Sequence, residues 1–233
     1  MCNNLKELRK SCESRRIPII SLATENFLWK LLRKHKPKIC LEIWGAVGYS
    51  SIYMGNIINT RGGKITAFEV SYPAYQEGIQ NIKQAHCYNI VRYPYDVRYA
   101  PIKKLVQVPK TKTPVDFIFI DGQKSQYGEY MEIIEKISSP HTVIVIDDVI
   151  KYHNKLSSLY GYLQKKQINC AQLPKPQMKS SVFGWENHTS DFWHRKHKPA
   201  CGGQVNELLS DFKNSRVYKV VQLEPDDGVM LFL

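Results

Sequence analysis

The stretch KICLEIWGAVGYSSIYMGNII (residues 38–58) places a strand-length apolar run, a glycine-containing loop and a helical pattern one after another. Residues 38–44 form a short run that is apolar except for Lys38 and Glu42, and they predict a buried strand. The apolar spacing over 49–58 predicts a helix. Gly45 and Gly48 lie between the two, where the chain needs freedom to turn. The stretch therefore predicts the first β-α unit of an α/β sheet.

The same alternation continues along the chain. Further strands are predicted over 64–70, 89–97, 115–121 and 142–149, and further helices over 73–85 and 126–138. Strands that are apolar on both faces and separated by helices are typical of a parallel sheet covered on both sides. Right-handed crossovers then predict a doubly wound α/β fold, whose ligands bind beyond the carboxyl ends of the strands.

The two ends of the chain add to this pattern. Residues 1–38 predict a basic helical segment, and residues 204–215 a further helix. Residues 218–233 predict two strands that close the sheet as an antiparallel hairpin. Residues 151–203 mix prolines, aromatic residues and cations without a period, which indicates a lid or docking insertion. We expect residues 1–233 to form a single domain that includes this insertion.

The composition is that of a globular chain, with 43% hydrophobic and 23% charged residues. No apolar run is long enough to span a bilayer, and the first residues are too polar for a secretory signal. The six cysteines are scattered without a CxxC pair, so we expect reduced thiols and a cytoplasmic location.

The net charge of +12 is concentrated in two segments. Residues 1–38 and 151–204 each carry a net charge of +7, so the rest of the chain is nearly neutral. This distribution suits a polyanionic partner such as RNA. Generic solubility, or a lysine-rich genomic bias, is the alternative interpretation.

The predicted strands end in acidic residues. They are Glu69, Asp96, Asp121, and the pair Asp147 and Asp148. Because the carboxyl ends of parallel strands meet at one edge of a sheet, these side chains should lie close together. Clustered carboxylates repel one another and need a cation or hydroxyl partners. The sequence therefore predicts a site at this edge.

Four stretches and the C-terminus resemble one family. They are RIPIISLATENFL (16–28), LEIWGAVGYSS (41–51), DFIFIDGQKSQYGEY (116–130), VIVIDDV (143–149) and the ending DDGVMLFL. They resemble the metal-dependent O-methyltransferases that use S-adenosylmethionine (SAM), of the catechol O-methyltransferase type. The similarity is greatest to the bacterial branch that includes tRNA 5-hydroxyuridine methyltransferases. The resemblance implies a Rossmann-like class I methyltransferase sheet, with SAM and Mg²⁺ as cofactors.

The resemblance also implies roles for individual residues. Asp121, Asp147 and Asp148 would bind Mg²⁺, and Lys124 would act as the general base. Glu69 would hold the ribose of SAM, in agreement with the general role of an acid at the end of the second strand. The remaining residues expected around SAM are Glu42, Gly45, Gly48, Ser50, Asp96, Val97 and Asp121. Asp121 would thus serve the metal, the cofactor and catalysis.

Three positions depart from the family pattern. Asp148 stands where the family has asparagine, and Trp44 and Ala46 stand where it has glycine. One interpretation is that Trp44 turns into the core while Gly45 takes over the turn. The other is that SAM binding is reduced or lost.

Three functions follow from these observations. The first is a Mg²⁺- and SAM-dependent O-methyltransferase that acts on a tRNA hydroxyl, such as a wobble 5-hydroxyuridine. The second is the same chemistry on a small catechol-like molecule. The third is a catalytically silent RNA-binding module. We expect no membrane partner, and the oligomeric state stays open, with a homodimer as one alternative.

Overall fold

A computed structural model describes residues 3–106, 114–166, 218–224 and 227–232. This part of the chain forms one seven-stranded sheet in the order β3-β2-β1-β4-β5-β7-β6. The strands are β1 (Ile39–Ile43), β2 (Lys64–Phe68), β3 (Ile90–Tyr93), β4 (Val115–Ile120), β5 (Ser138–Ile146), β6 (Tyr218–Glu224) and β7 (Asp227–Phe232).

The pairing confirms the predicted mixture of parallel and antiparallel strands. β3, β2, β1, β4 and β5 are parallel, whereas β7 pairs antiparallel with β5 and with β6. The chain runs outward from β1 to β3, then returns to β4 on the other side of β1. β1 and β4 therefore flank the topological switch point, where ligands of doubly wound sheets bind.

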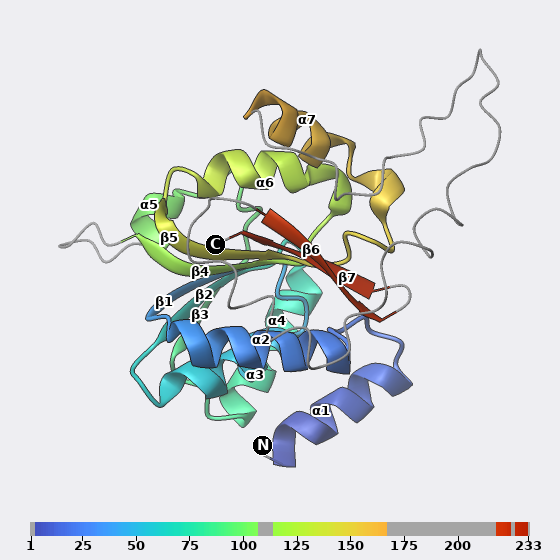
Figure 1. The fold of residues 1–233 in the computed structure, drawn as a ribbon. Helices are drawn as coiled ribbons and strands as arrows, with labels where there is room; N and C mark the ends of the chain where they lie inside the picture. Colours follow the sequence, from blue (N-terminus) through green and yellow to red (C-terminus); the bar gives the residue numbers. More distant parts are fainter. Residues whose placement is uncertain (1–2, 107–113, 167–217, 225–226, 233) are drawn as a thin grey trace.

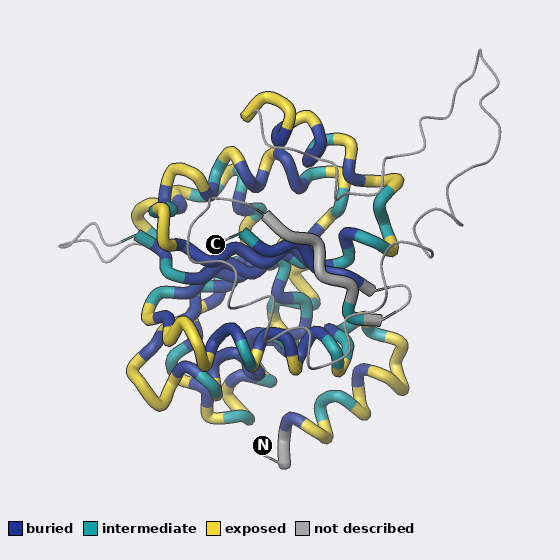
Figure 2. The backbone as a smooth tube through the Cα atoms, viewed as in Figure 1, coloured by how far each residue is buried: buried dark blue, intermediate teal, exposed yellow. Residues whose placement is uncertain are grey.

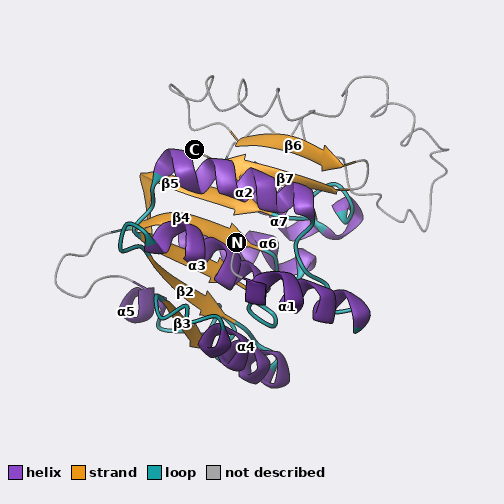
Figure 3. Ribbon diagram, turned by 90° about the horizontal axis from the view of Figure 1, so that it is seen from below, coloured by secondary structure: helices purple, strands orange, loops and turns teal. Residues whose placement is uncertain are grey.

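Helices cover both faces of the sheet (Figure 1, Figure 3). One face carries α1 (Asn3–Ser14), α2 (Leu22–His35), α3 (Tyr49–Asn59) and α4 (Tyr72–Gln84). The opposite face carries α5 (Ile102–Val106), α6 (Tyr127–Ile134) and α7 (Ser157–Lys165). Among the described residues, no helix combines the length and apolar character needed to cross a bilayer.

The central strands are buried on both faces, as their apolar sequences predict (Figure 2). In β1, Cys40 packs with the helices α1–α4, whereas Leu41 and Ile43 pack with α5–α7. Alternate residues of a strand point to opposite faces, so one short strand contributes to two separate cores.

Local sequence signals account for several boundaries. Ser21 and Ser71 cap α2 and α4 by accepting backbone N–H bonds, which is a preferred helix start. Pro94, which cannot donate to a ladder, follows the last residue of β3. The prediction for 126–138 was wrong at its end, because α6 stops at Ile134 and β5 already begins at Ser138. β5 accommodates Pro140 because the β4–β5 register shifts there, leaving residues 140 and 141 exposed.

The basic segment 1–38 forms two helices that brace the start of α3. Tyr49, the first residue of α3, donates its hydroxyl to Glu25 of α2 at 2.5 Å. Arg9 of α1 donates to the same hydroxyl at 3.0 Å and pairs with Glu25. This network ties α1 and α2 to the start of α3. Of the predicted insertion 151–203, only residues up to 166 are described, and the predicted helix 204–215 lies outside the described residues.

Candidate active site at the carboxyl edge of the sheet

Backbone bonds continue the parallel ladder just beyond the strands and align the residues that follow them. The N–H of Asp121 donates to Ile43 at 3.2 Å, and the N–H of Asp147 donates to Ile120 at 2.9 Å. The N–H of Glu69 donates to Tyr93 at 3.1 Å. Glu69, Asp121 and Asp147 are therefore brought to one edge, with Asp121 beside the end of β1 at the switch point.

The loop after β1 turns through left-handed backbone at residues other than Gly45. Trp44 has φ 69°, Ala46 φ 39° and Gly48 φ 86°. The expectation that Gly45 takes over the turn was wrong, because both residues that replace glycine keep a positive φ. The Trp44 ring is only partly buried, against the core beneath α5–α7. Side chains at positive φ clash with their own backbone, so this loop is strained by about 1–2 kcal/mol per residue.

Ala46→Gly should stabilise the protein by up to about 1 kcal/mol, because relief of the left-handed conformation outweighs the added freedom of the unfolded chain. Ala74→Gly, in the first turn of α4, is the matched control and should destabilise the protein by about 1 kcal/mol or less. Urea unfolding of both variants measures the change in the free energy of unfolding, which should be positive for Ala46→Gly and negative for Ala74→Gly. Destabilisation by Ala46→Gly would contradict the strain at this position.

A buried arginine on β3, Arg92, is hydrogen-bonded to the loop after β1. Register places Glu42 of β1, Ala67 of β2 and Arg92 of β3 in one row across the sheet. The small Ala67 leaves room for the guanidinium, which donates to the carbonyls of Gly45 at 3.2 Å and Ala46 at 2.5 Å. Arg92 is 5% exposed. Burial lowers the pKa of Arg92, and the nearby carboxylates Glu42 and Glu69 oppose that shift.

Glu42 is completely buried beneath the loop. Its carboxylate accepts a hydrogen bond from Ser50 at 2.5 Å and another from Ser51. Burial raises the pKa of Glu42, whereas the two serines and Arg92 act in the opposite direction. In this arrangement Glu42 orders the start of α3, and its oxygens face the serines at the bottom of the site.

Two further acids predicted to contact SAM, Glu69 and Asp96, are also engaged within the protein. Glu69 is 2% exposed and accepts N–H bonds from Ala46 at 2.8 Å and Ser71 at 2.7 Å. Asp96 accepts bonds from Arg98, including one at 2.7 Å. Burial opposes the charge on Asp96, but the bonds from Arg98 prevail and lower its pKa. Val97, which follows Asp96 and is also expected around SAM, is buried in the core beneath α5–α7.

Lys124 joins two of the three predicted metal ligands. Its Nζ lies 2.7 Å from Oδ1 of Asp121 and 2.9 Å from Oδ2 of Asp148, and 5.6 Å from the ring centroid of Tyr152. Burial disfavours the charge on Lys124, but the two carboxylates outweigh burial and raise its pKa. Lys124 therefore carries a proton here. A role as base would require another cation to neutralise these carboxylates.

The oxygen ligands of Asp121, Asp147 and Asp148 suit Mg²⁺, but the arrangement of these side chains does not. Three carboxylates are suitable oxygen ligands. The ammonium group of Lys124 already bridges Asp121 and Asp148, and the Oδ1 of Asp147 accepts the N–H of Asp148 at 2.9 Å. Within the described part of the chain, no three His, Cys, Asp or Glu side chains are grouped to hold a metal ion. A metal would have to displace Lys124.

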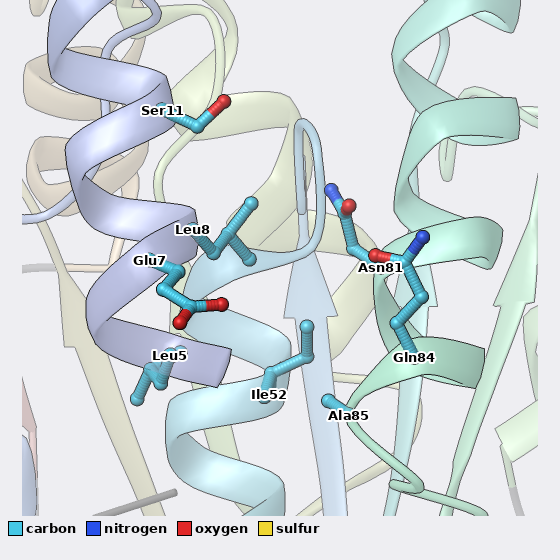
Figure 4. Close-up of a pocket in the computed structure, with 8 residues that line it drawn as sticks. All are labelled: Leu5, Glu7, Leu8, Ser11, Ile52, Asn81, Gln84 and Ala85. Carbon is cyan, nitrogen blue, oxygen red and sulfur yellow. The ribbon is translucent and has the colours of Figure 1, made fainter. Parts of the chain in front are cut away.

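A separate pocket lies among helices rather than at the strand ends (Figure 4). It is lined by α1, α3 and α4, with Leu5, Leu8 and Ile52 on one side and Asn81 and Ala85 on the other. Its lining contains none of the predicted site residues.

Two residues of the site were missed by sequence reasoning. Arg92 could have been noticed as a cation at an inward position of a predicted strand, where burial demands an anionic partner. Tyr130 of α6, which accepts a hydrogen bond from the indole of Trp44 at 2.8 Å, had no such signal.

The fold matches those of solved methyltransferase structures. An O-methyltransferase from Bacillus cereus in complex with SAH aligns with a TM-score of 0.62 at 19% identity, covering 100% of this chain and 91% of that chain. The O-methyltransferase TomG from Streptomyces achromogenes in complex with SAM aligns with a TM-score of 0.59 at 18% identity, covering 100% and 90%. Together with acidic strand ends at the switch point, these matches define an α/β protein of the methyltransferase fold.

The chain belongs to the O-methyltransferase family, whose model matches residues 2–170. A caffeoyl-CoA O-methyltransferase of Stellaria longipes is 28% identical over 151 residues, covering 63% of this chain and 61% of that protein. A catechol O-methyltransferase of Niastella koreensis is 30% identical over 138 residues, covering 58% and 61%. The chain thus spans about three fifths of the length of these relatives.

Proposed function

We propose that this protein transfers a methyl group from SAM to a hydroxyl group, at the edge formed by the ends of β1, β2, β4 and β5. The observation that carries the proposal is the alignment of Glu69, Asp121 and Asp147 just beyond β2, β4 and β5, beside a switch-point loop with glycines. That edge is where doubly wound sheets bind nucleotide-like ligands. Membership of the O-methyltransferase family supports the same chemistry.

In this proposal, the cofactor lies along the loop that contains Gly45 and Gly48, with its ribose at Glu69. Bound SAM would supply an electrophilic methyl group. Lys124 and Asp121 would hold the acceptor hydroxyl, Lys124 as a donor in the arrangement described above and Asp121 as the acceptor of the proton that the hydroxyl loses. Mg²⁺ stays part of the proposal on the condition that it displaces Lys124 from Asp121 and Asp148.

We propose RNA, and specifically a tRNA, as the acceptor on the basis of the +12 net charge. The fold separates the basic regions. Lys34 and Lys36 end α2 and lead into the start of β1, at the amino edge of the sheet and away from the site. Lys151 and Lys155 follow β5 at the carboxyl edge, and both lie against the ring of Tyr152. Phosphate contacts near the reacting hydroxyl would therefore come from this second region.

Lys151→Glu/Lys155→Glu should weaken tRNA binding and flatten its dependence on salt by about two in the logarithmic slope, because two phosphate contacts are lost. Lys34→Glu/Lys36→Glu makes the same charge change at the far edge and should reduce methyl transfer much less. Transfer of labelled methyl from SAM to tRNA, and tRNA affinity over a salt series, measure both effects. Equal losses in the two variants would contradict docking at the carboxyl edge.

A small catechol-like acceptor is the second candidate, favoured by the names of the relatives described above. Methyl transfer to a catechol with no transfer to tRNA would select it. No transfer to either acceptor, together with retained tRNA binding, would select the silent RNA-binding module. We also propose a cytoplasmic location, supported by the buried thiols of Cys12 and Cys40, which form no disulfide within the described part of the chain.

A further inference from the structure

The indole of Trp44 lies across the switch point of the sheet. Trp44 is the first residue after β1, and Gly122 is the second residue after β4. A Cβ added to Gly122 would lie 2.5 Å from Cδ1 of Trp44, so the indole rests directly on the Gly122 backbone. Nε1, the ring atom bonded to Cδ1, donates to the hydroxyl of Tyr130 on α6 at 2.8 Å. The ring thus spans β1, the end of β4 and α6.

The residues around the indole are matched to it. Only glycine at position 122 leaves room for the ring, because any Cβ there would clash with three of its atoms. Tyr130 is fully buried, and its hydroxyl is also bonded to Gln126 at 2.6 Å. The indole N–H of Trp44 therefore donates to a hydroxyl that is itself held in place, and this hydrogen bond fixes the position of the indole.

The same loop also covers the acid expected to hold the cofactor ribose. Glu69 is 2% exposed, and one of its oxygens accepts the N–H of Ala46, two residues from Trp44. Trp44 and Ala46 both hold strained, positive φ angles. Strained backbone of this kind is concentrated at active sites, ligand clamps and switch regions. Opening at Trp44 would move the partner of Glu69 as well.

We infer that Trp44 is a gate over the cofactor crevice: its indole and the nucleoside part of SAM compete for the switch point. The inference rests on the proposed function and adds a residue that controls cofactor affinity. SAM binds only the conformation in which the bond from Trp44 to Tyr130 is broken. The apparent dissociation constant is therefore raised by the inverse of the open fraction.

Calorimetric titration with S-adenosylhomocysteine tests the gate. Trp44→Gly should bind at least about tenfold more tightly than the parent protein, because the competing ring is absent. Tyr130→Phe keeps the indole of Trp44 and the packing around it but removes the hydrogen bond between Trp44 and Tyr130. This variant should bind S-adenosylhomocysteine about two- to tenfold more tightly. Trp29→Phe, on the surface of α2 where Trp29 is 47% exposed, is the control and should leave affinity unchanged.

The outcomes separate the gate from the proposed function. Equal, measurable affinity in the parent, Trp44→Gly and Tyr130→Phe proteins would overturn the gate and leave the proposed function standing. Binding by none of them would overturn the proposed function and the gate with it. A second readout is the indole N–H resonance of Trp44, assigned by its loss in Trp44→Gly. This resonance should shift when the parent protein is saturated with S-adenosylhomocysteine. An unchanged resonance at saturation would overturn the gate.

Discussion

Arg92→Met should lower the free energy of unfolding by about 3–5 kcal/mol, because it leaves buried acids without their cation. Arg92 faces Glu42 and Glu69 and donates to the carbonyls of Gly45 and Ala46, so the variant loses a charge partner and two hydrogen bonds. Guanidinium unfolding of the variant and the parent protein measures the difference.

The loss should depend on pH in a defined direction. Burial raises the pKa of Glu42 and Arg92 opposes that shift, so removal of Arg92 raises the pKa further. An acid whose pKa is raised on folding stabilises the fold below its unfolded pKa, and this contribution is lost as pH rises. The deficit of Arg92→Met should therefore be smaller near about pH 5 than near about pH 8. A deficit that grows towards low pH would contradict the charge balance beneath the loop.

Lys165→Met is the matched control for Arg92→Met. Lys165 pairs with Glu132 at 2.9 Å, but both side chains are at least half exposed. Exposed ion pairs contribute little, so stability should hardly change at either pH. A loss as large as that of Arg92→Met would show that removing any paired cation destabilises this protein.

Asp121→Ala should abolish methyl transfer, with a fall of at least about a hundredfold, because charged groups aligned in a site act strongly on the reaction. Asp121 lies at the switch point beside the end of β1 and holds Lys124 at 2.7 Å. Its loss removes the carboxylate proposed for the cofactor and metal, and leaves Lys124 paired with Asp148 alone. Transfer of labelled methyl, with Mg²⁺ and with a chelator, measures the effect.

Glu132→Gln removes a carboxylate from the outer surface of α6 and is the control for Asp121→Ala. Glu132 pairs with Lys165 and contacts none of the proposed site residues in the described structure. Its methyl transfer should equal that of the parent protein. Full activity in Asp121→Ala would contradict the proposed active site for either acceptor.

Much of the architecture was predictable because it depends on local patterns. Apolar runs such as 115–121 could be interpreted as buried strands, and the helices between them required a parallel sheet. The hairpin of β6 and β7 was predictable in the same way, and is confirmed. The end of α6 was not, because a register shift between β4 and β5 accommodates Pro140, and register is a property of two strands.

The acidic edge was likewise predictable, because parallel strands bring their carboxyl ends together whatever the packing around them. The partners of those acids were not. Lys124 lies between Asp121 and Asp148, which are separated by more than twenty residues along the chain, and Arg92 reaches Glu42 across the intervening β2. Such pairs form only when the sheet sets distant residues side by side.

The sequence by itself thus determined the order of strands and helices, the sheet covered on both faces and the edge where the acids gather. These features follow from hydrophobic periodicity and from the direction of the chain. Only the tertiary structure decided what those acids bind and where the indole of Trp44 goes. The ring direction depends on the absence of a Cβ at Gly122 and on the hydroxyl of Tyr130, which lie far along the chain and become its neighbours only in the packed fold.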